Sequence, residues 1–272
     1  MTSTYELVIR ASLLTIEPKV CTTSLAEHPQ GYCYSRQDCA LLNGTSADSC
    51  DTNYGFCCTF SRTCGGSTLT NITSFVNPSY PSVDKTSGDC SIEVALISNN
   101  ICQLRLDLQK FVLAQPNLDG VCDTDYLSVS GTANDADIPR ICGTNSGQHI
   151  YVNVDPTRSP KIIMKTGASE FERSWNIIIT QIDCNSPKKA PDGCLQYHSE
   201  LTGVVESFNY RKPTNIIEID SNQVQRHLAN LNYAVCLARM GGCKITWTPS
   251  QTESPYAFIM SGDAKTDTVQ IV

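Results

Sequence analysis

Apolar and polar residues alternate along several short segments between residues 90 and 182. Because successive side chains of a strand point to opposite faces, this period of two indicates strands with one buried face. Turn-forming clusters separate the segments, as at Ser98–Asn100 and Gly143–Asn145. Short strands at such spacing predict an all-β, antiparallel sandwich. The alternating apolar positions are Ile92, Val94 and Leu96; Leu104, Leu106 and Leu108; Leu127 and Val129; Ile150, Val152 and Val154; and Trp175, Ile177 and Ile179, with Ile178 and Ile182 on the opposite face.

Cysteine spacing changes near Cys64, which indicates a domain boundary. Six cysteines crowd between residues 21 and 58, whereas those after Cys64 lie far apart. A module of about 40 residues buries too little apolar area to be stable without such staples. We therefore predict a disulfide module at 21–60 and a sandwich at 61–184. Residues 1–20 lack the unbroken apolar stretch of a signal peptide and are expected to be a disordered N-terminal segment.

The sequence after residue 193 echoes the sequence before it. Ile72–Phe75 recurs as Val205–Phe208, and Cys102–Leu106 recurs as Cys243–Trp247. A repeat longer than about 100 residues predicts duplicated domains. The prolines and glycine of 185–193 predict a linker, so residues 194–272 are expected to form a second, incomplete sandwich. The best helical periodicity, Asn222–Leu231, falls in an insertion within it.

Composition restricts the compartment and the partners. The chain has 15 cysteines in 272 residues, with no Cys-x-x-Cys pair, and a net charge of −7. This density predicts disulfides and a secreted, extracellular protein. No basic stripe suits nucleic acid, and no run of about 18 apolar residues suits a membrane span. The odd count leaves at least one cysteine without an internal partner: it pairs with another chain, or the chain is incomplete.

Four motifs between residues 64 and 175 resemble a CUB domain. They are Cys64-Gly65-Gly66, Ser74–Pro81 before Cys90, Cys122–Leu127 before Cys142-Gly143, and the strand around Trp175. The resemblance implies a jelly-roll β-sandwich with the disulfides Cys64–Cys90 and Cys122–Cys142, each contributing about 3 kcal/mol. Ile101–Val112 and Pro191–Tyr197 are similar to arthropod secreted proteins with two CUB domains.

The first six cysteines, which end in the doublet Cys57-Cys58, resemble a clip module; another six-cysteine knot is the alternative. The clip resemblance implies the pairs Cys21–Cys57, Cys33–Cys50 and Cys39–Cys58.

Five cysteines remain. Cys236 and Cys243 flank Arg239–Gly242 symmetrically, which suits a cross-strand disulfide on a hairpin. For Cys102, Cys184 and Cys194, spacing allows either Cys184–Cys194 across the linker or Cys102–Cys184 between two strands.

A calcium site is the sharpest ligand hypothesis that the CUB resemblance brings. Members that bind the ion use a Glu before the third cysteine, an Asp just after it and an Asp in a later loop. Asp125 matches the middle position, but Ala114-Gln115 and Gly167–Glu170 supply neither of the others. Asp119, Asp123 and Glu170 are oxygen donors of the kind that suits this ion, in a different geometry. We therefore predict no cofactor and no metal, with Asp125 as the weak calcium candidate; alternatively it is a solvated residue at a strand start that bonds a nearby backbone N–H.

No catalytic site is predicted. The four histidines, His28, His149, His198 and His227, lie in no catalytic motif, and no Gly-x-Ser-x-Gly elbow occurs. We expect them to be exposed structural residues. Asn43-Gly44-Thr45 and Asn71-Ile72-Thr73 are glycosylation sequons, so Asn43 and Asn71 are candidate glycan sites.

The sequence favours a secreted, non-catalytic glycoprotein that binds extracellular proteins. The CUB and clip resemblances imply a link to extracellular protease cascades or innate immunity. Candidate partner-surface residues are Asp137, Arg140, Tyr80, Tyr126 and Tyr151. The alternative is the non-catalytic N-terminal part of a modular serine protease; a third reading is a calcium-dependent adhesion module.

Overall fold

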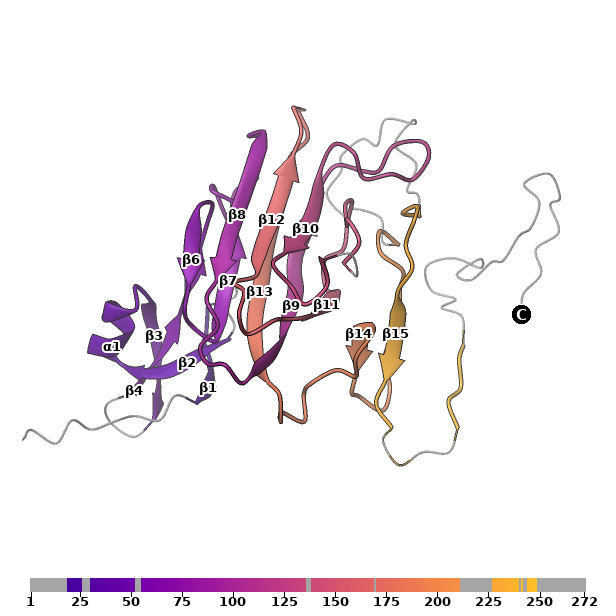
Figure 1. The fold of residues 1–272 in the computed structure, drawn as a ribbon. Coiled ribbons are helices and arrows are strands. Elements are labelled where there is room, and N and C mark those ends of the chain that lie inside the picture. The colour runs from indigo at the N-terminus through magenta and orange to yellow at the C-terminus, as the bar shows by residue number, and fades with distance from the viewer. Residues whose placement is uncertain are drawn as a thin grey trace, which may run out of the picture. The chain divides into compact units, whose positions relative to one another are not determined.

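The computed structural model describes residues 19–25, 30–51, 55–135, 138–168, 170–210, 227–239, 241 and 244–248. The chain divides into two units, Met1–Ala238 and Arg239–Val272. Nearly every described element of the first unit is a strand (Figure 1). No helix in the described part of the chain is long and apolar enough to cross a lipid bilayer. The predicted N-terminal segment, 1–20, lies almost wholly outside the described residues.

The N-terminal module is a small antiparallel sheet held by three disulfides. Its strands lie in the order β1-β2-β4-β3, with the short helix α1 between β2 and β3. The disulfides are Cys21–Cys57, Cys33–Cys50 and Cys39–Cys58, the pairs that the clip resemblance implies. The elements are β1 (Val20–Thr22), β2 (Gln30–Ser35), α1 (Arg36–Leu41), β3 (Thr45–Asp51) and β4 (Gly55–Thr59).

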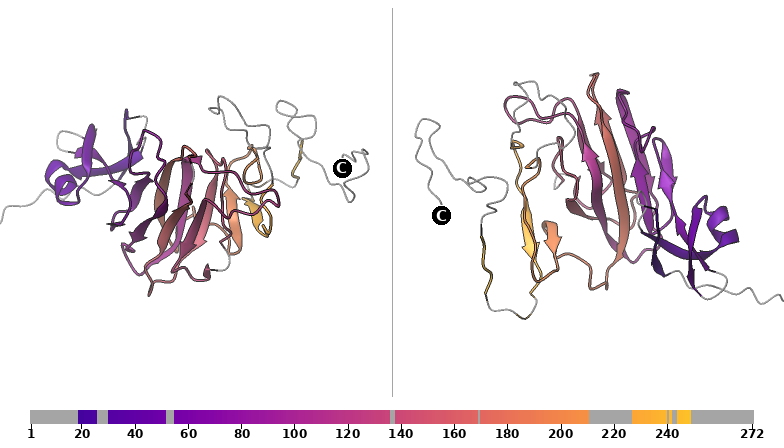
Figure 2. Two further views of the ribbon diagram at one scale, coloured as in Figure 1. Left: turned by 90° about the horizontal axis from the view of Figure 1, so that it is seen from above. Right: turned by 180° about the vertical axis from the view of Figure 1, so that it is seen from behind.

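Residues 61–183 form the jelly-roll β-sandwich. One sheet has the order β10-β12-β8-β6 and the other β11-β9-β13-β7-β5, antiparallel except for the short pairs β5–β7 and β6–β8 (Figures 1 and 2). The strands are β5 (Ser61–Arg62), β6 (Gly66–Thr68), β7 (Ile72–Val76), β8 (Gly88–Val94), β9 (Ile101–Val112), β10 (Tyr126–Ser130), β11 (His149–Asn153), β12 (Lys161–Thr166) and β13 (Ser174–Asp183).

Alternation places the core between the two sheets. Leu104, Leu106 and Leu108 of β9 are fully buried against β8 and β10 residues such as Ile92 and Leu127. At about 25 cal/mol per Å², burying a Leu or Ile side chain stabilises the fold by about 1.5–3 kcal/mol. Each alternating segment of the sequence is a strand, which confirms those predictions. Strand β12 was not predicted, because the run Ile162–Met164 shows no clear period of two.

Three disulfides tie the sandwich. Cys64–Cys90 and Cys122–Cys142 are the pairs that the CUB resemblance implies. Cys102–Cys184 joins the start of β9 to the end of β13, which decides between the two alternatives left open by spacing.

The chain after β13 folds back onto the sandwich. We call residues 194–210 and 227–238 the strap; it includes the parallel strands β14 (Cys194–His198) and β15 (Ala234–Leu237). Cys194 pairs with Cys236. The predicted Cys236–Cys243 disulfide is therefore wrong, because pairing of β14 with β15 brings Cys194 to Cys236. Cys243 lies outside the described residues.

The strap is anchored at both of its described parts. Phe208 is fully buried and joins the sandwich core, as do Leu195 and Leu228. Before the strap, the linker is clamped: Ala190 N–H donates to Gln103 Oε1 at 2.8 Å, and Gln103 Nε2 donates back to Ala190 O at 3.0 Å. Residues 194–210 and 227–238 thus share one compact unit with the sandwich.

Two local predictions fail within the strap. Val205–Phe208 is not a strand, although Ile72–Phe75, which it echoes, lies in β7. The predicted helix Asn222–Leu231 is described only from His227, where the chain forms a turn with Asn230 at φ 60°. Most of the second unit lies outside the described residues, so the second sandwich stays a prediction; Ile245 and Trp247 are exposed there.

Peptide mapping of the non-reduced protein tests the strap disulfide. Tryptic cleavage places Cys194 in 190–211, Cys236 in 227–239 and Cys243 in 240–244. We expect a linked species of 190–211 with 227–239 that reduction separates. A linked species of 227–239 with 240–244 would instead support the Cys236–Cys243 disulfide.

Candidate functional site

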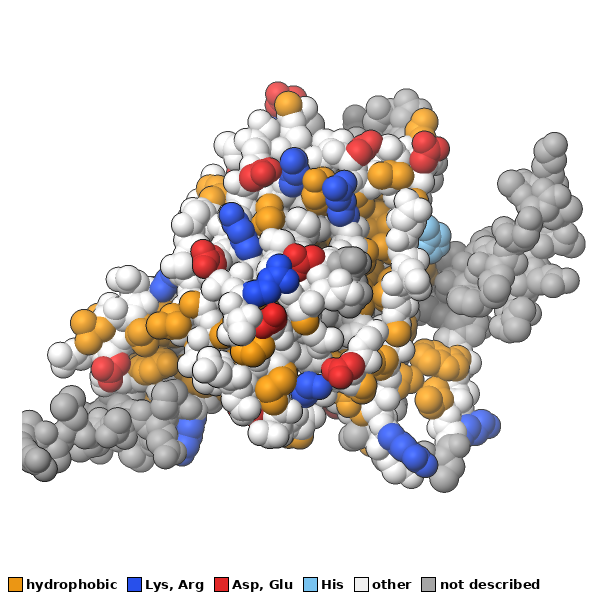
Figure 3. All heavy atoms as spheres, in the orientation of Figure 1, with side chains coloured by type: hydrophobic (Ala, Val, Ile, Leu, Met, Phe, Trp, Pro, Cys, Tyr) orange, Lys and Arg blue, Asp and Glu red, His pale blue; other side chains and the backbone are white. Residues whose placement is uncertain are grey.

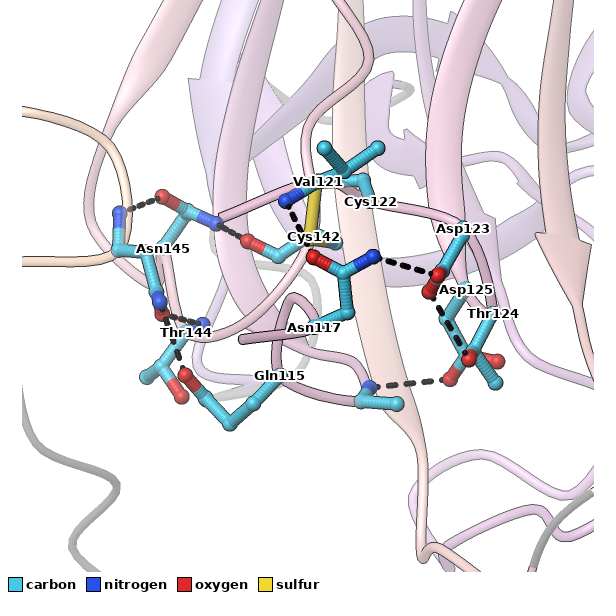
Figure 4. Close-up of a disulfide and its surroundings, with 12 residues drawn as sticks. Gln115, Asn117, Val121, Cys122, Asp123, Thr124, Asp125, Cys142, Thr144 and Asn145 are labelled. Carbon is cyan, nitrogen blue, oxygen red and sulfur yellow. Dashed lines mark hydrogen bonds between the residues drawn. A yellow bond between two sulfur atoms is a disulfide. The ribbon is translucent and has the colours of Figure 1, made fainter. Parts of the chain in front are cut away.

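The candidate site is one end of the sandwich, where two loops meet around the Cys122–Cys142 disulfide (Figure 4) and a third loop contacts Asp125. We call residues 113–125, 138–148 and 167–173 the loop end. The first two loops are joined by backbone: Leu113 N–H donates to Gly143 O at 2.9 Å, and Gly143 N–H donates to Ala114 O at 3.0 Å. Loops at the end of a rigid sandwich commonly carry binding functions.

Asn117 organises the first loop. Its Oδ1 accepts hydrogen bonds from the N–H groups of Asp119 and Val121, both at 3.0 Å, and its Nδ2 donates to Asp123 Oδ2 at 2.7 Å (Figure 4). Gly120, at φ 79°, makes the turn between them, where a side chain would be strained. Hydrogen bonds inside the loop hold its shape. Leu118 projects from it into solvent, with 73% of its surface exposed.

Asp125 is buried in an ion pair with Arg173. Arg173 Nε donates to Oδ2 at 2.7 Å and Nη2 donates to Oδ1 at 3.0 Å, in a bidentate arrangement. The N–H groups of Ala114 and Gly167 donate to the same two oxygens at 2.9 Å each. Both side chains are fully buried. The expected bond to a backbone N–H is present, but Asp125 is buried rather than solvated. A complete set of hydrogen-bond partners compensates for its burial.

These residues do not fit a calcium ion. An ionised carboxylate offers about four lone-pair sites, and Asp125 uses four for hydrogen bonds within the chain. Asp123 bonds Asn117, and Glu170 is exposed beside Lys85. Within the described ranges, no group of three or more His, Cys, Asp or Glu residues could hold a metal ion.

The strap packs against the loop end through side-chain amides. Asn209 Oδ1 accepts from Thr144 N–H at 2.9 Å, and its Nδ2 donates to Gln115 Oε1 at 2.8 Å. Asn209 N–H donates to Asn145 Oδ1 at 2.7 Å. Gly143 is required here, because a Cβ atom at that position would collide with the Asn209 side chain.

Two histidines that are distant in sequence meet where the strap covers β11. The rings of His149 and His198 have centroids 5.0 Å apart. His149 is buried, with Nε2 3.1 Å from Tyr197 N and 3.0 Å from Tyr197 O. Burial, and next the Arg105 guanidinium, lower the pKa of His149 to about 4; the same causes lower the pKa of His198. The expectation that the histidines are exposed is wrong for His149, because β14 covers it. His28 lies outside the described residues.

The predicted partner-surface residues do not form one cluster. The Arg140 guanidinium stacks 4.4 Å from the Tyr126 ring centroid, at the loop end. Tyr151 is buried under the strap, so it is unavailable to a partner. Tyr80 OH accepts from Asn176, and Asp137 lies outside the described residues. On the face seen in Figure 3, basic and acidic side chains are interspersed, which favours no polyanionic partner.

The two sequons differ in their surroundings. Asn43 is exposed at a turn, with φ 54°. Asn71 is half-buried: its Nδ2 donates to Tyr32 OH in the N-terminal module at 2.6 Å, and its Oδ1 accepts from Gln181 N–H at 2.9 Å. Asn71 thus links the module to the sandwich.

One Ser–His contact was not foreseen. Ser207 Oγ lies 3.4 Å from His227 Nδ1. Among the hydrogen bonds of the described residues, no carboxylate orients this histidine, which a catalytic triad requires.

One protein-family model matches part of the chain. Residues 191–272 match the Animal CUB domain family. No curated protein matches the chain. The match covers the predicted second domain, whereas the CUB resemblance of 61–184, the clip identity of the module and the arthropod type stay predictions.

Solved structures similar to the chain include CUB domains. The MASP-1 CUB2 domain bound to Ca2+ has 18% identity and a TM-score of 0.36, over 43% of this chain and 98% of that chain. The CUB1-EGF-CUB2 domains of rat MASP-1 have 18% identity and a TM-score of 0.37, over 50% of this chain. The human MASP-1/3 counterpart has 16% identity and a TM-score of 0.38, over 53%. The chain spans 57% of the rat and of the human three-domain structures.

Arg173 is the residue at the loop end that the sequence analysis missed. A single charged residue two positions before Trp175 carries no signal of burial by itself.

The buried His149 predicts a pH dependence of stability. The pKa of His149 is about 4 in the folded chain, against 6.5 for an unperturbed histidine. Below pH 6.5 the unfolded chain therefore binds a proton at His149 that the folded chain binds only near pH 4. Stability contributed by His149 is therefore complete above pH 6.5 and falls as pH drops toward 4, by about 2 kcal/mol allowing for solvent screening.

Denaturant unfolding of wild type and His149→Gln at pH 7.5 and pH 4.5 measures this loss. We expect the variant to lose less stability over that interval, whereas the exposed control His227→Gln should behave like wild type. Equal losses in wild type and His149→Gln would contradict the assignment.

Proposed function

We propose that the protein is a secreted, non-catalytic protein-recognition protein that binds an extracellular partner through the loop end. The observation that carries this proposal is preorganisation. Asn117, the Cys122–Cys142 disulfide and Asp125 fix three loops before any partner arrives. A preordered loop loses little conformational entropy on binding, which favours recognition.

The cysteines support the proposed extracellular compartment. Among the described residues, fourteen cysteines between Cys21 and Cys236 form seven disulfides. Such disulfides persist in an oxidising environment. The Animal CUB match at 191–272 supports an interaction role. We further propose that this role belongs to extracellular protease cascades or innate immunity. No cofactor is needed for this role.

A pair of matched surface variants tests the recognition surface. Leu118 (73% exposed) lies at the loop end, and Leu69 (61% exposed) precedes β7 at the opposite end. The probe is the immobilised full chain, exposed to extracellular fluid of its own source. We expect Leu118→Asp to lose the specifically captured protein by about tenfold or more, because a charge replaces an exposed apolar anchor. Leu69→Asp is expected to retain it.

Three outcomes would refute the proposal: no captured protein, equal loss in both variants, or loss only in Leu69→Asp. Reading the coding sequence beyond Val272 separates the alternative. A downstream domain with a His, Asp and Ser triad would make this chain the non-catalytic front of a modular serine protease.

We also propose Asn43 as the glycosylated residue. Mass spectrometry of glycopeptides should find a glycan on Asn43 and an unmodified Asn71, because a glycan on Asn71 Nδ2 would crowd Tyr32. Full glycan occupancy at Asn71, or an unmodified Asn43, would contradict this proposal. Asn71→Gln is expected to be less stable than wild type, whereas Asn43→Gln should be as stable as wild type.

A further inference from the structure

The Asp125–Arg173 pair lies where the loops of the loop end meet the strands that flank them. Asp125 precedes β10, Arg173 precedes β13, and their partners Ala114 and Gly167 follow β9 and β12. Arg173 Nη2 also donates to Gly167 O at 2.6 Å, and Nη1 donates to Phe171 O at 3.4 Å. One guanidinium therefore joins a carboxylate to two loop carbonyls.

Those same oxygens are the ligands that a hard divalent cation prefers. A carboxylate together with backbone carbonyls is a usual donor set for calcium. A guanidinium differs from such a cation in being planar, permanently charged and part of the chain. It neutralises Asp125 fully, so no negative charge is left at this position to attract an ion.

We propose that Arg173 stands in the place of a bridging cation, so that the loop end is ordered without calcium, and that removing its side chain creates a cation site. Arg173 is thus a positioning residue for the loops. The inference concerns how the loops are ordered, so it stands or falls separately from the identity of any partner.

Neighbouring charges do not supply a second site. Asp84, which exchanges backbone hydrogen bonds with Arg173, has both carboxylate oxygens bonded by Thr86. Glu172 pairs with Lys85 at 3.5 Å on the surface. A calcium response in a variant of Arg173 would therefore report on Asp125.

Thermal unfolding with and without calcium tests the proposal. The probe is calcium chloride at millimolar concentration against EDTA, with the full chain. Wild type should show the same Tm in both and no heat on calcium titration. Arg173→Ala should melt lower in EDTA and recover part of the loss in calcium, because calcium binds only the folded form. The double variant Asp125→Asn with Arg173→Ala lacks the carboxylate and should show no recovery.

Two results overturn the proposal. Calcium binding by wild type, seen as heat and a raised Tm, would show that the pair does not replace a cation. An equal calcium response in Arg173→Ala and in the double variant would show that the vacated position is not a cation site.

A conservative variant covers the case in which Arg173→Ala does not fold. Arg173→Lys keeps the charge but loses the bidentate fork. We expect amide exchange in 114–124 and 167–172 to be about tenfold faster while β9 amides near Leu106 stay protected. Unchanged exchange in both loops would refute the positioning role.

Discussion

The pairing of β9 with β13 is the interaction on which the rest of the structure depends. Ile101–Val112 and Ser174–Asp183 run antiparallel along their full length, with two irregularities in register. The Cys102–Cys184 disulfide closes this pair at one end. At the other end, Arg173 reaches Asp125. Strands more than 60 residues apart in sequence thus fix both the core and the loops, a non-local arrangement whose closure costs entropy.

The buried carboxylate of Asp125 at the loop end is tolerated because it is paired. A buried charge without partners would cost several kcal/mol, whereas a bidentate pair with two added backbone donors satisfies every oxygen of Asp125. The amides of Asn209, Asn145 and Gln115 form a second hydrogen-bonded network, which joins the strap to the loop end. Each network restrains a loop to one geometry, which connects the packing of this end to its proposed use in recognition.

The strap changes how the second part of the chain is understood. Phe208, Leu195 and Leu228 contribute to the core of the first sandwich. The Animal CUB match nevertheless begins at residue 191, so these residues lie within the stretch that the family model matches. Segments that share a core do not move independently. We infer that the start of the matched domain is coupled tightly to the sandwich, through the linker clamp at Gln103 as well as the buried Phe208.

The sequence by itself determined the alternating strands of the sandwich and which of their faces is buried. Leu104, Leu106 and Leu108 show this, because alternation records which side of a strand is buried, and that is a local property. Its cysteine motifs also indicated five of the seven disulfides, through family resemblance. Only the tertiary structure decided Cys194–Cys236, the burial of His149 and the Asp125–Arg173 pair. These depend on contacts between residues more than 40 positions apart, and neither spacing nor periodicity records which distant side chains meet.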